Sequence, residues 1–291
     1  MEPKELRVIA YNTEKGLHPD YKSYNTIPEG MPKFVQVLDE IDELRRGLVG
    51  VSDAREWQNI PIAELRKQTG YKHIYVQPLR DKRLQAVEGL SGIENHDNAV
   101  AILSGYPIVQ ATGLRLGNRF AAQALIKLSD KHTLPFVVAY LDDLEEETRQ
   151  MQAKKLLEAL KEKPTAIVAG DLNSSSPEWS SPSRERLERL YKTEVGKPIQ
   201  AKHGEQIEQM LNSRVIQLFR EYGFDTALPV RFSPTFPTKK LSPEIAQPVL
   251  AIDHVMYRGS LTSVESYVHI SEASQQASDH FPLVSTFSVH N

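Results

Sequence analysis

Residues 165–173 read TAIVAGDLN, a short apolar run that ends in a glycine, an aspartate and an asparagine. The run from Thr165 to Ala169 is too apolar to alternate between a buried and an exposed face. This is typical of a strand that is covered on both sides. Asp171 and Asn173 then follow the strand directly, so the stretch predicts packed sheets with polar groups at the strand ends.

Similar strands are expected on both sides of this stretch. Their Val, Ile, Tyr and Phe content suits pleated, half-buried surfaces. They lie at Leu6–Tyr11, Leu48–Ser52, Tyr71–Val76, Ala99–Leu103, Ala122–Leu128, Leu134–Tyr140, Ala251–Tyr257 and Leu283–Phe287. Apolar residues at the helical period predict helices at Pro32–Arg46, Glu145–Lys161 and Glu205–Tyr222. Long loops are expected at Ser174–Ser183 and Pro229–Pro248.

Composition excludes several classes of protein. The 291 residues include 35 Lys and Arg, 38 Asp and Glu and no Cys, for a formal charge of −3. The lack of cysteine excludes thiol catalysis and thiolate metal sites. The charge does not favour nucleic-acid binding by bulk electrostatics, although a nucleic-acid substrate with a local basic groove stays open. No apolar run approaches the ~20 residues of a membrane helix, and no signal peptide is visible. A soluble protein is therefore expected, with the cytoplasm favoured, and the oligomeric state stays open.

Five segments end or begin a strand with acidic, amide or imidazole groups. They are YNTEKG (11–16), SDAREW (52–57), GDLN (170–173), IDH (252–254) and SDH (278–280). Each segment alone is typical of a turn or a helix cap. Strand ends of packed sheets meet at one edge, however, where so many polar groups are costly unless they share a cation or a proton network. The five segments therefore predict one site.

The residue types at these strand ends select a kind of metal. The chain has no cysteine and no HExxH motif, which disfavours zinc. Carboxylate and amide oxygens suit hard cations, so Mg²⁺ is expected, with Mn²⁺ or Ca²⁺ as substitutes. Mg²⁺ held by a few carboxylates usually serves phosphate oxygens, which makes phosphoester hydrolysis the leading chemistry.

The motifs also carry a resemblance to a known family. GDLN and SDH are the most specific, and YN at Tyr11-Asn12, AILSGYPI at 101–108, TFPT at 235–238 and IDH support them in the same order. From about Leu6 to Phe287 the chain resembles the endonuclease/exonuclease/phosphatase superfamily. This superfamily includes DNase I, abasic-site nucleases of the exonuclease III type, neutral sphingomyelinases and inositol-polyphosphate 5-phosphatases. The resemblance implies a four-layer α/β sandwich, two mixed β-sheets face to face with helices outside, as a single domain over residues 1–291.

The resemblance implies catalytic roles for five residues. Asp171 positions and deprotonates the attacking water, and Asn173 orients a phosphoryl oxygen. His280 stabilises the developing charge or moves a proton, and Asp253 holds its ring. Asn12 hydrogen-bonds around the phosphate. A carboxylate behind an imidazole fixes the tautomer of the ring and raises its pKa, so a charged His280 ring can face phosphate near neutral pH.

The resemblance also implies a metal site at Glu14 and Asp53, with Asp279 facing it from the C-terminal side. One departure affects this site. The family usually has Gln-Glu where this chain has Ser52-Asp53. Aspartate keeps the charge but shortens the reach by one methylene, so Glu56 is an alternative ligand.

A second departure lies at Tyr140, where many members of the family have a histidine. Abasic-site nucleases resemble this chain in having a tyrosine there, and a phenol can donate a hydrogen bond to phosphate. The alternative is a tyrosine packed in the core.

Cations for a phosphate-binding patch are available at Arg115, Arg119, Arg231, Lys239 and Lys240.

Together these observations predict a Mg²⁺-dependent phosphodiesterase that hydrolyses a phosphate ester by in-line attack of water. Two alternatives stay open. The first is a nuclease of the abasic-site or DNase I type. The second is a catalytically inactive binding module with the same fold, which the departures at Asp53 and Tyr140 motivate.

Overall fold

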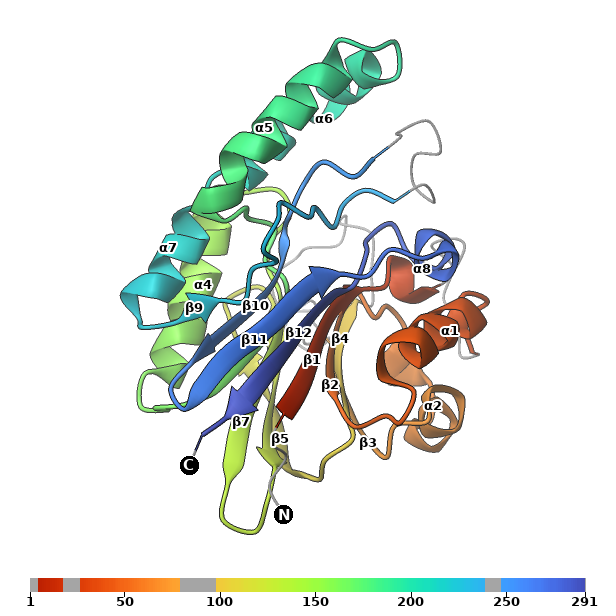
Figure 1. Cartoon of the computed structure of the whole chain (residues 1–291), viewed down its shortest axis with the longest axis vertical. Coiled ribbons are helices and arrows are strands. Elements are labelled where there is room, and N and C mark those ends of the chain that lie inside the picture. The colour runs from red at the N-terminus through yellow and green to blue at the C-terminus, as the bar shows by residue number, and fades with distance from the viewer. Residues whose placement is uncertain (1–4, 18–26, 79–97, 239–246, 291) are drawn as a thin grey trace, which may run out of the picture.

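The computed structural model describes residues 5–17, 27–78, 98–238 and 247–290. Two six-stranded sheets lie face to face (Figure 1). The first has the order β11-β12-β1-β2-β4-β3, from β1 (Glu5–Asn12), β2 (Leu48–Ser52), β3 (His73–Pro78), β4 (Ala99–Ser104), β11 (Leu261–Val268) and β12 (Leu283–Val289). The second has the order β5-β6-β7-β8-β10-β9, from β5 (Ile108–Arg115), β6 (Phe120–Lys127), β7 (Thr133–Tyr140), β8 (Ala166–Asp171), β9 (Asp225–Thr226) and β10 (Asp253–Arg258).

Each sheet contains a pair of parallel neighbours. In the first sheet β1 runs parallel to β2, with Asn12 beside Ser52. In the second sheet β7 runs parallel to β8, with Tyr140 beside Asp171. Neighbouring parallel strands end at the same edge, so each sheet presents two carboxyl ends together. The other strand pairs are antiparallel, which makes both sheets mixed, as predicted.

An apolar layer fills the space between the sheets. Alternate residues of β1, such as Val8 and Ala10, point into this layer and meet residues of the second sheet such as Val138 and Ala169. The sheets approach closely at Gly50, where an added Cβ would lie 2.9 Å from Cγ2 of Val138 and 3.1 Å from Cβ of Ala169. A residue without a side chain is therefore needed at this point of β2.

Helices cover the outer faces of both sheets. The first sheet is covered by α1 (Met31–Asp42), α2 (Ile62–Thr69) and α8 (Glu272–Ala277), and α4 (Glu146–Leu160) and α7 (Arg214–Glu221) cover the second. Short 3₁₀ turns occur at Lys15–Leu17 and Trp57–Asn59. Two sheets between two helical layers confirm the predicted four-layer α/β sandwich. In the described part of the chain, no helix is both long and apolar enough to cross a membrane.

The structure corrects two of the predicted elements. The expected loop Ser174–Ser183 is wrong, because α5 (Pro177–Tyr191) begins inside it. Pro177 occupies the first turn, where a helix needs no backbone N–H, so this proline favours the helix. The expected single helix Glu205–Tyr222 is two helices, α6 (Gly196–Met210) and α7. The break lies at Asn212, whose side-chain oxygen accepts a 3.0 Å hydrogen bond from the backbone N–H of Arg214. Figure 1 shows α5 and α6 projecting beyond the sheets as a pair.

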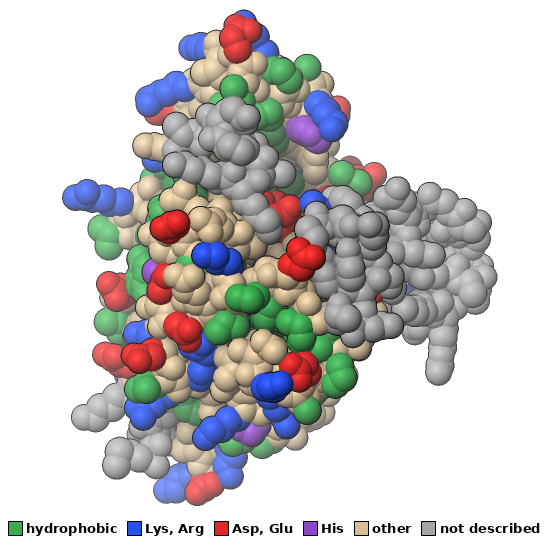
Figure 2. Space-filling model, turned by 90° about the vertical axis from the view of Figure 1, so that its right-hand side faces the viewer, with side chains coloured by type: hydrophobic (Ala, Val, Ile, Leu, Met, Phe, Trp, Pro, Cys, Tyr) green, Lys and Arg blue, Asp and Glu red, His purple; other side chains and the backbone are tan. Residues whose placement is uncertain are grey.

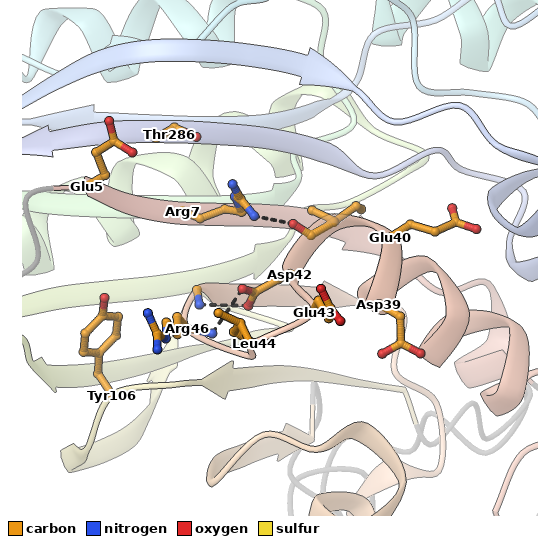
Figure 3. A pocket seen from close by; sticks show the side chains of 12 residues that line it. Glu5, Arg7, Asp39, Glu40, Asp42, Glu43, Leu44, Arg46, Tyr106 and Thr286 are labelled. Carbon is orange, nitrogen blue, oxygen red and sulfur yellow. Dashed lines mark hydrogen bonds between the residues drawn. The ribbon is translucent and has the colours of Figure 1, made fainter.

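A cavity of about 670 Å³ lies beside the amino-terminal end of β1 and the end of α1 (Figure 3). Arg7 donates a hydrogen bond to the carbonyl of Ile41 on one side of it. Asp42 accepts hydrogen bonds from the backbone N–H groups of Arg46 at 3.1 Å and Gly47 at 2.8 Å. These contacts end α1 and direct the chain into the start of β2, at the opposite end of the first sheet from Asn12.

Candidate active site

Asn12, Asp171 and Asn173 come together at the edge where the parallel strands end. Asp171 is buried at the end of β8, and its Oδ2 accepts a 3.0 Å hydrogen bond from Nδ2 of Asn12 at the end of β1. Its Oδ1 accepts a 2.9 Å hydrogen bond from the backbone N–H of Asn173. The carboxylate is thus oriented by one donor from β1 of the first sheet and one from the loop that follows β8.

The backbone at this point permits little variation. Gly170 has φ +137°, and an added Cβ would lie 2.1 Å from the carbonyl oxygen of Ala139. The next backbone N–H, that of Asp171, donates a 3.0 Å hydrogen bond to Oγ of Ser52. Ser52 is fully buried at the end of β2, so this bond ties the two sheets together beside Asp171. The serine that replaces the family's usual glutamine therefore has a structural partner.

His280 and Asp253 form a buried pair on the other side of Asp171. Nδ1 of His280 lies 2.7 Å from Oδ2 of Asp253, and Nε2 lies 3.9 Å from Oδ2 of Asp171. Asp279 is 4.0 Å from the same ring nitrogen. Burial opposes the charged ring, but the charges of Asp253, Asp279 and Asp171 outweigh it and raise the pKa of His280 to about 10. This shift favours the charged form of the His280 ring at neutral pH.

The pKa of Asp171 is raised as well, but here burial contributes to the increase instead of opposing it. Burial first, and then the charge of Asp253, raise the pKa of Asp171, while His280, Asn173 and Asn12 lower it. A carboxylate whose pKa lies above its ordinary value accepts a proton more readily near neutral pH. The site thus pairs a proton-accepting carboxylate with a cationic ring.

Asp53 and Glu14 lie together beside Asn12, whose Oδ1 accepts a 2.9 Å hydrogen bond from the Glu14 N–H. Oδ2 of Asp53 accepts a 2.9 Å hydrogen bond from the backbone N–H of Lys15, and the Asn98 side chain also hydrogen-bonds this carboxylate. Burial, with a smaller contribution from the charge of Glu14, raises the pKa of Asp53. Its Oδ1 is buried without a hydrogen-bond partner among the described residues. A buried carboxylate oxygen of this kind suits a hard cation, so Asp53 and Glu14 fit a divalent metal.

The backbone also brings Glu14 and Asp53 to this place in an uncommon conformation. Glu14 has φ +40° and Asp53 has φ +49°, and both lie in the left-handed region that most side chains avoid. Non-glycine residues in this region concentrate at functional sites, where the surrounding structure holds them. The turn is fixed by Gly16, whose N–H donates a 2.7 Å hydrogen bond to the carbonyl of Asp53.

The other candidate metal ligands are placed differently. The Glu56 carboxylate accepts a hydrogen bond from the Asn59 side chain. Asp279 lies on the His280 side of the site, and its carbonyl accepts a 2.8 Å hydrogen bond from the N–H of Thr238. Asp171, Asp253 and His280 also offer one ligand atom each within 4.8 Å of one another. Nδ1 of His280 is already bonded to Asp253, which favours a proton network for this trio.

Tyr140 stands beside Asp171 at the end of β7. Burial and the charges of Asp53, Asp143 and Asp171 raise the pKa of its hydroxyl well above the ordinary value, so Tyr140 remains a neutral donor. The ring is covered by the guanidinium of Arg119 at 4.9 Å. The Arg119 side chain therefore points toward Tyr140 and is only 12% exposed. Lys239 and Lys240, two further cations of the predicted phosphate-binding patch, lie outside the described residues.

Sequence reasoning assigns no role to two serines of the motifs. Ser52 is noticed in the sequence only because it stands where the family usually has glutamine. Ser278 donates a 2.7 Å hydrogen bond to the carbonyl of Asn12 and accepts one of 3.2 Å from the N–H of His280. The available signal is that these serines directly precede Asp53 and Asp279 in the sequence.

Comparisons with known proteins bear on the family and the fold of the chain. A family model described as the Endonuclease/Exonuclease/phosphatase family matches residues 33–280. No curated protein matches the chain by sequence. An AP endonuclease from Archaeoglobus fulgidus has 17% identity and a TM-score of 0.64, over 98% of this chain and 100% of that one. An endonuclease/exonuclease/phosphatase family protein from Bacteroides thetaiotaomicron has 14% identity and a TM-score of 0.64, over 100% of both chains. The human Nocturnin catalytic domain with bound sulfate has 16% identity and a TM-score of 0.55, over 100% of this chain and 97% of that one. At these identities the solved structures show a shared fold.

Proposed function

The chain belongs to the endonuclease/exonuclease/phosphatase family, and we propose that it is a Mg²⁺-dependent phosphodiesterase that hydrolyses its substrate by in-line attack of water. The observation that carries this proposal is the Asp171 carboxylate, which is held by Asn12 and Asn173 and faces Nε2 of His280 at 3.9 Å. A base for water and a cation for the developing negative charge thus lie within one small space.

The proposed roles follow from the contacts of each side chain. Asp171 accepts the proton of the attacking water, and the two hydrogen bonds to its oxygens keep the carboxylate in one orientation. Cationic His280 stabilises charge on the phosphate, and Asp253 fixes its ring through Nδ1. Asn173 uses one side-chain N–H on the carbonyl of Leu141 at 3.1 Å, and its second N–H is proposed to hold a phosphoryl oxygen.

Glu14 and Asp53 are the residues proposed to hold Mg²⁺, with Asp279 on the opposite side. A bound divalent ion supplies positive charge to the phosphate oxygens. The chain prepares this place by fixing Oδ2 of Asp53 on the Lys15 N–H and leaving the buried Oδ1 for a ligand. Glu56 is the alternative ligand, and its carboxylate accepts a hydrogen bond from Asn59.

Tyr140 supports a second candidate, a nuclease that acts at abasic sites. Its neutral hydroxyl lies at the strand end beside Asp171, where it can donate a hydrogen bond to a phosphate. The surface gives this candidate less support. Acidic and basic side chains are interspersed on the face shown in Figure 2, and the formal charge of the chain is −3.

A substrate screen of the purified chain tests both candidates. Bis-p-nitrophenyl phosphate, abasic and plain duplex DNA, RNA, sphingomyelin and phosphoinositides would be offered with Mg²⁺, with EDTA, and with the variant His280→Ala. We expect Mg²⁺-dependent cleavage that EDTA and the substitution abolish. Preference for abasic DNA would favour the nuclease. The absence of turnover on every substrate would leave the inactive binding module.

A further inference from the structure

We propose that Arg119 is a positioning residue of this site, which holds the Tyr140 ring and the Leu141 carbonyl and thereby sets the places of the Tyr140 hydroxyl and the Asn173 amide. The importance of this role for catalysis rests on the proposed function. The contacts themselves exist whatever reaction the site performs.

Arg119 contacts both the side chain and the backbone at the end of β7. Its guanidinium carbon lies 4.9 Å from the centroid of the Tyr140 ring. Its Nη1 donates hydrogen bonds to the carbonyls of Leu141 at 2.7 Å and Tyr140 at 3.3 Å. A planar guanidinium can stack on a ring and donate along its edge at the same time, which an ammonium cannot do. The ring and the following peptide are therefore fixed as one unit.

The Leu141 peptide connects Arg119 to the candidate catalytic residues. Its carbonyl also accepts the 3.1 Å hydrogen bond from Nδ2 of Asn173. Its N–H donates a 3.1 Å hydrogen bond to the carbonyl of Asp171. The N–H of Asn173 in turn holds Oδ1 of Asp171 at 2.9 Å. Movement of the Leu141 backbone would therefore displace Asp171, the proposed base, and Asn173, which orients it.

Arg119 is itself held in place from its other side. Nη2 donates a 2.7 Å hydrogen bond to Oδ1 of Asp143 and lies 3.7 Å from Oδ2 of Asp142. The Gln152 side chain of α4 then bridges the Asp142 N–H and the Asn118 side chain, both at 2.8 Å. The Arg119 side chain is only 12% exposed. A cation with these partners is suited to holding neighbouring groups in position rather than to binding phosphate from solvent.

Arg258 offers a matched control at the other end of the same sheet. Its guanidinium carbon lies 4.6 Å from the Phe224 ring centroid, and it donates to the carbonyls of Lys163 at 2.9 Å and Tyr222 at 2.8 Å. It ends β10, the strand that begins at Asp253, so it makes the same kinds of contact away from the site. A merely structural role for Arg119 predicts that the two arginines respond alike to substitution.

The first experiment compares Arg119→Lys with Arg258→Lys in the full chain. Lysine keeps the charge but cannot stack and donate in the same geometry. We expect Arg119→Lys to lower kcat for bis-p-nitrophenyl phosphate by about 10- to 100-fold with a small change in KM, because small displacements of catalytic groups cost this much. Both substitutions should lower the melting temperature by similar amounts, but Arg258→Lys should leave kcat unchanged. Equal kcat in both variants would overturn the proposal.

A double-mutant cycle tests whether Arg119 acts through Tyr140. If it does, Arg119→Lys should lower kcat by a smaller factor in the Tyr140→Phe background than in the wild type. The same factor in both backgrounds would overturn the connection through the tyrosine.

Amide hydrogen exchange tests the positioning without any turnover. The N–H groups of Leu141 and Asn173 should exchange faster in Arg119→Lys than in the wild type, and at the wild-type rate in Arg258→Lys. Unchanged protection in Arg119→Lys would overturn the proposal even if the enzyme is active. If the wild type cleaves no substrate, the proposed function fails, and this measurement still decides the role of Arg119.

Discussion

Nδ2 of Asn12 lies 3.0 Å from Oδ2 of Asp171, and this contact joins the last residue of β1 to the last residue of β8 across the two sheets. The N–H of Asp171 makes a second such connection to Oγ of Ser52 at 3.0 Å. The proposed base is therefore oriented by the first sheet although it belongs to the second. Its geometry depends on how the sheets are packed.

The substitution Asp171→Asn tests the proposed role of this carboxylate as the base. The amide that replaces it would keep an acceptor for the Asn173 N–H but could no longer take a proton from water. We expect kcat to fall by about 10²- to 10⁴-fold, the usual contribution of a general base. The melting temperature should change little, because the substitution keeps the size of a buried side chain. Asp130→Asn, at an exposed acid of the β6–β7 turn, is the control and should retain full activity.

Asp53 and Glu56 can be separated by a metal titration. Asp53→Asn should raise the Mg²⁺ concentration needed for half-maximal activity by about 10-fold or more, since its buried Oδ1 is the proposed ligand. Glu56→Gln keeps an acceptor for Asn59 and should give the wild-type titration. Calorimetric titration of each variant with Mg²⁺ measures the same difference without substrate. A shift confined to Glu56→Gln would assign the ligand to Glu56 instead.

Two of the three histidines in the 252–280 region, His254 and His280, should titrate in opposite ways. The pKa of His280 is raised to about 10, so its ring should stay charged from about pH 6 to about pH 8, where an ordinary histidine loses its proton. The pKa of His254 is lowered by burial, with Nε2 at 2.7 Å from the Ser174 carbonyl, so it should stay neutral near pH 7. Nuclear magnetic resonance titration of the EDTA-treated protein measures both.

Asp253→Asn provides the internal check of this assignment. Removing the charge that contributes most to raising the pKa of His280 should move its titration to lower pH and leave His254 neutral near pH 7. An unchanged His280 titration in this variant would contradict the pairing of the two residues.

Tyr71 predicts a loss of stability at alkaline pH. Its hydroxyl donates a 2.6 Å hydrogen bond to Asp42, and burial together with the Asp42 charge raises its pKa well above 10. Above pH 10 the unfolded chain releases a proton that the folded chain keeps, so the free energy of unfolding falls by up to about 1.4 kcal/mol per pH unit. Chemical denaturation between neutral pH and about pH 11 measures this slope. Tyr71→Phe should show a shallower slope, and an identical slope would contradict the prediction.

Sequence patterns place the residues of the candidate site at strand ends more accurately than they predict some of the elements around it. Asp171, Asn173 and Asp53 follow apolar runs directly, so the change from apolar to polar residues marked the ends of strands. The pairing of His280 with Asp253 came from the resemblance, because no local pattern connects residues 27 positions apart. The geometry keeps both residues at the predicted edge.

The sequence patterns failed to predict some strands and helices, and each failure has a physical reason. The strands β5 and β11 lie at sheet edges, and their mixed burial gives no clean alternation. The Ser/Pro content of 174–183 favoured a loop, whereas Pro177 and the buried Trp179 are compatible with the first turns of α5. The inward direction of Arg119 depends on Tyr140, Leu141 and Asp143, which meet it only after β6 and β7 pair.

The close approach of the sheets at Gly50 has a consequence for partly folded states. A molten globule retains strands and helices but loses the tight interdigitation of side chains and expands. Such a state would keep β1 and β8 and yet separate Asn12 and Ser52 from Asp171. Mild acid or denaturant should therefore abolish activity while the far-ultraviolet circular dichroism is still native. The rate of turnover then reports on the tertiary packing of the two sheets.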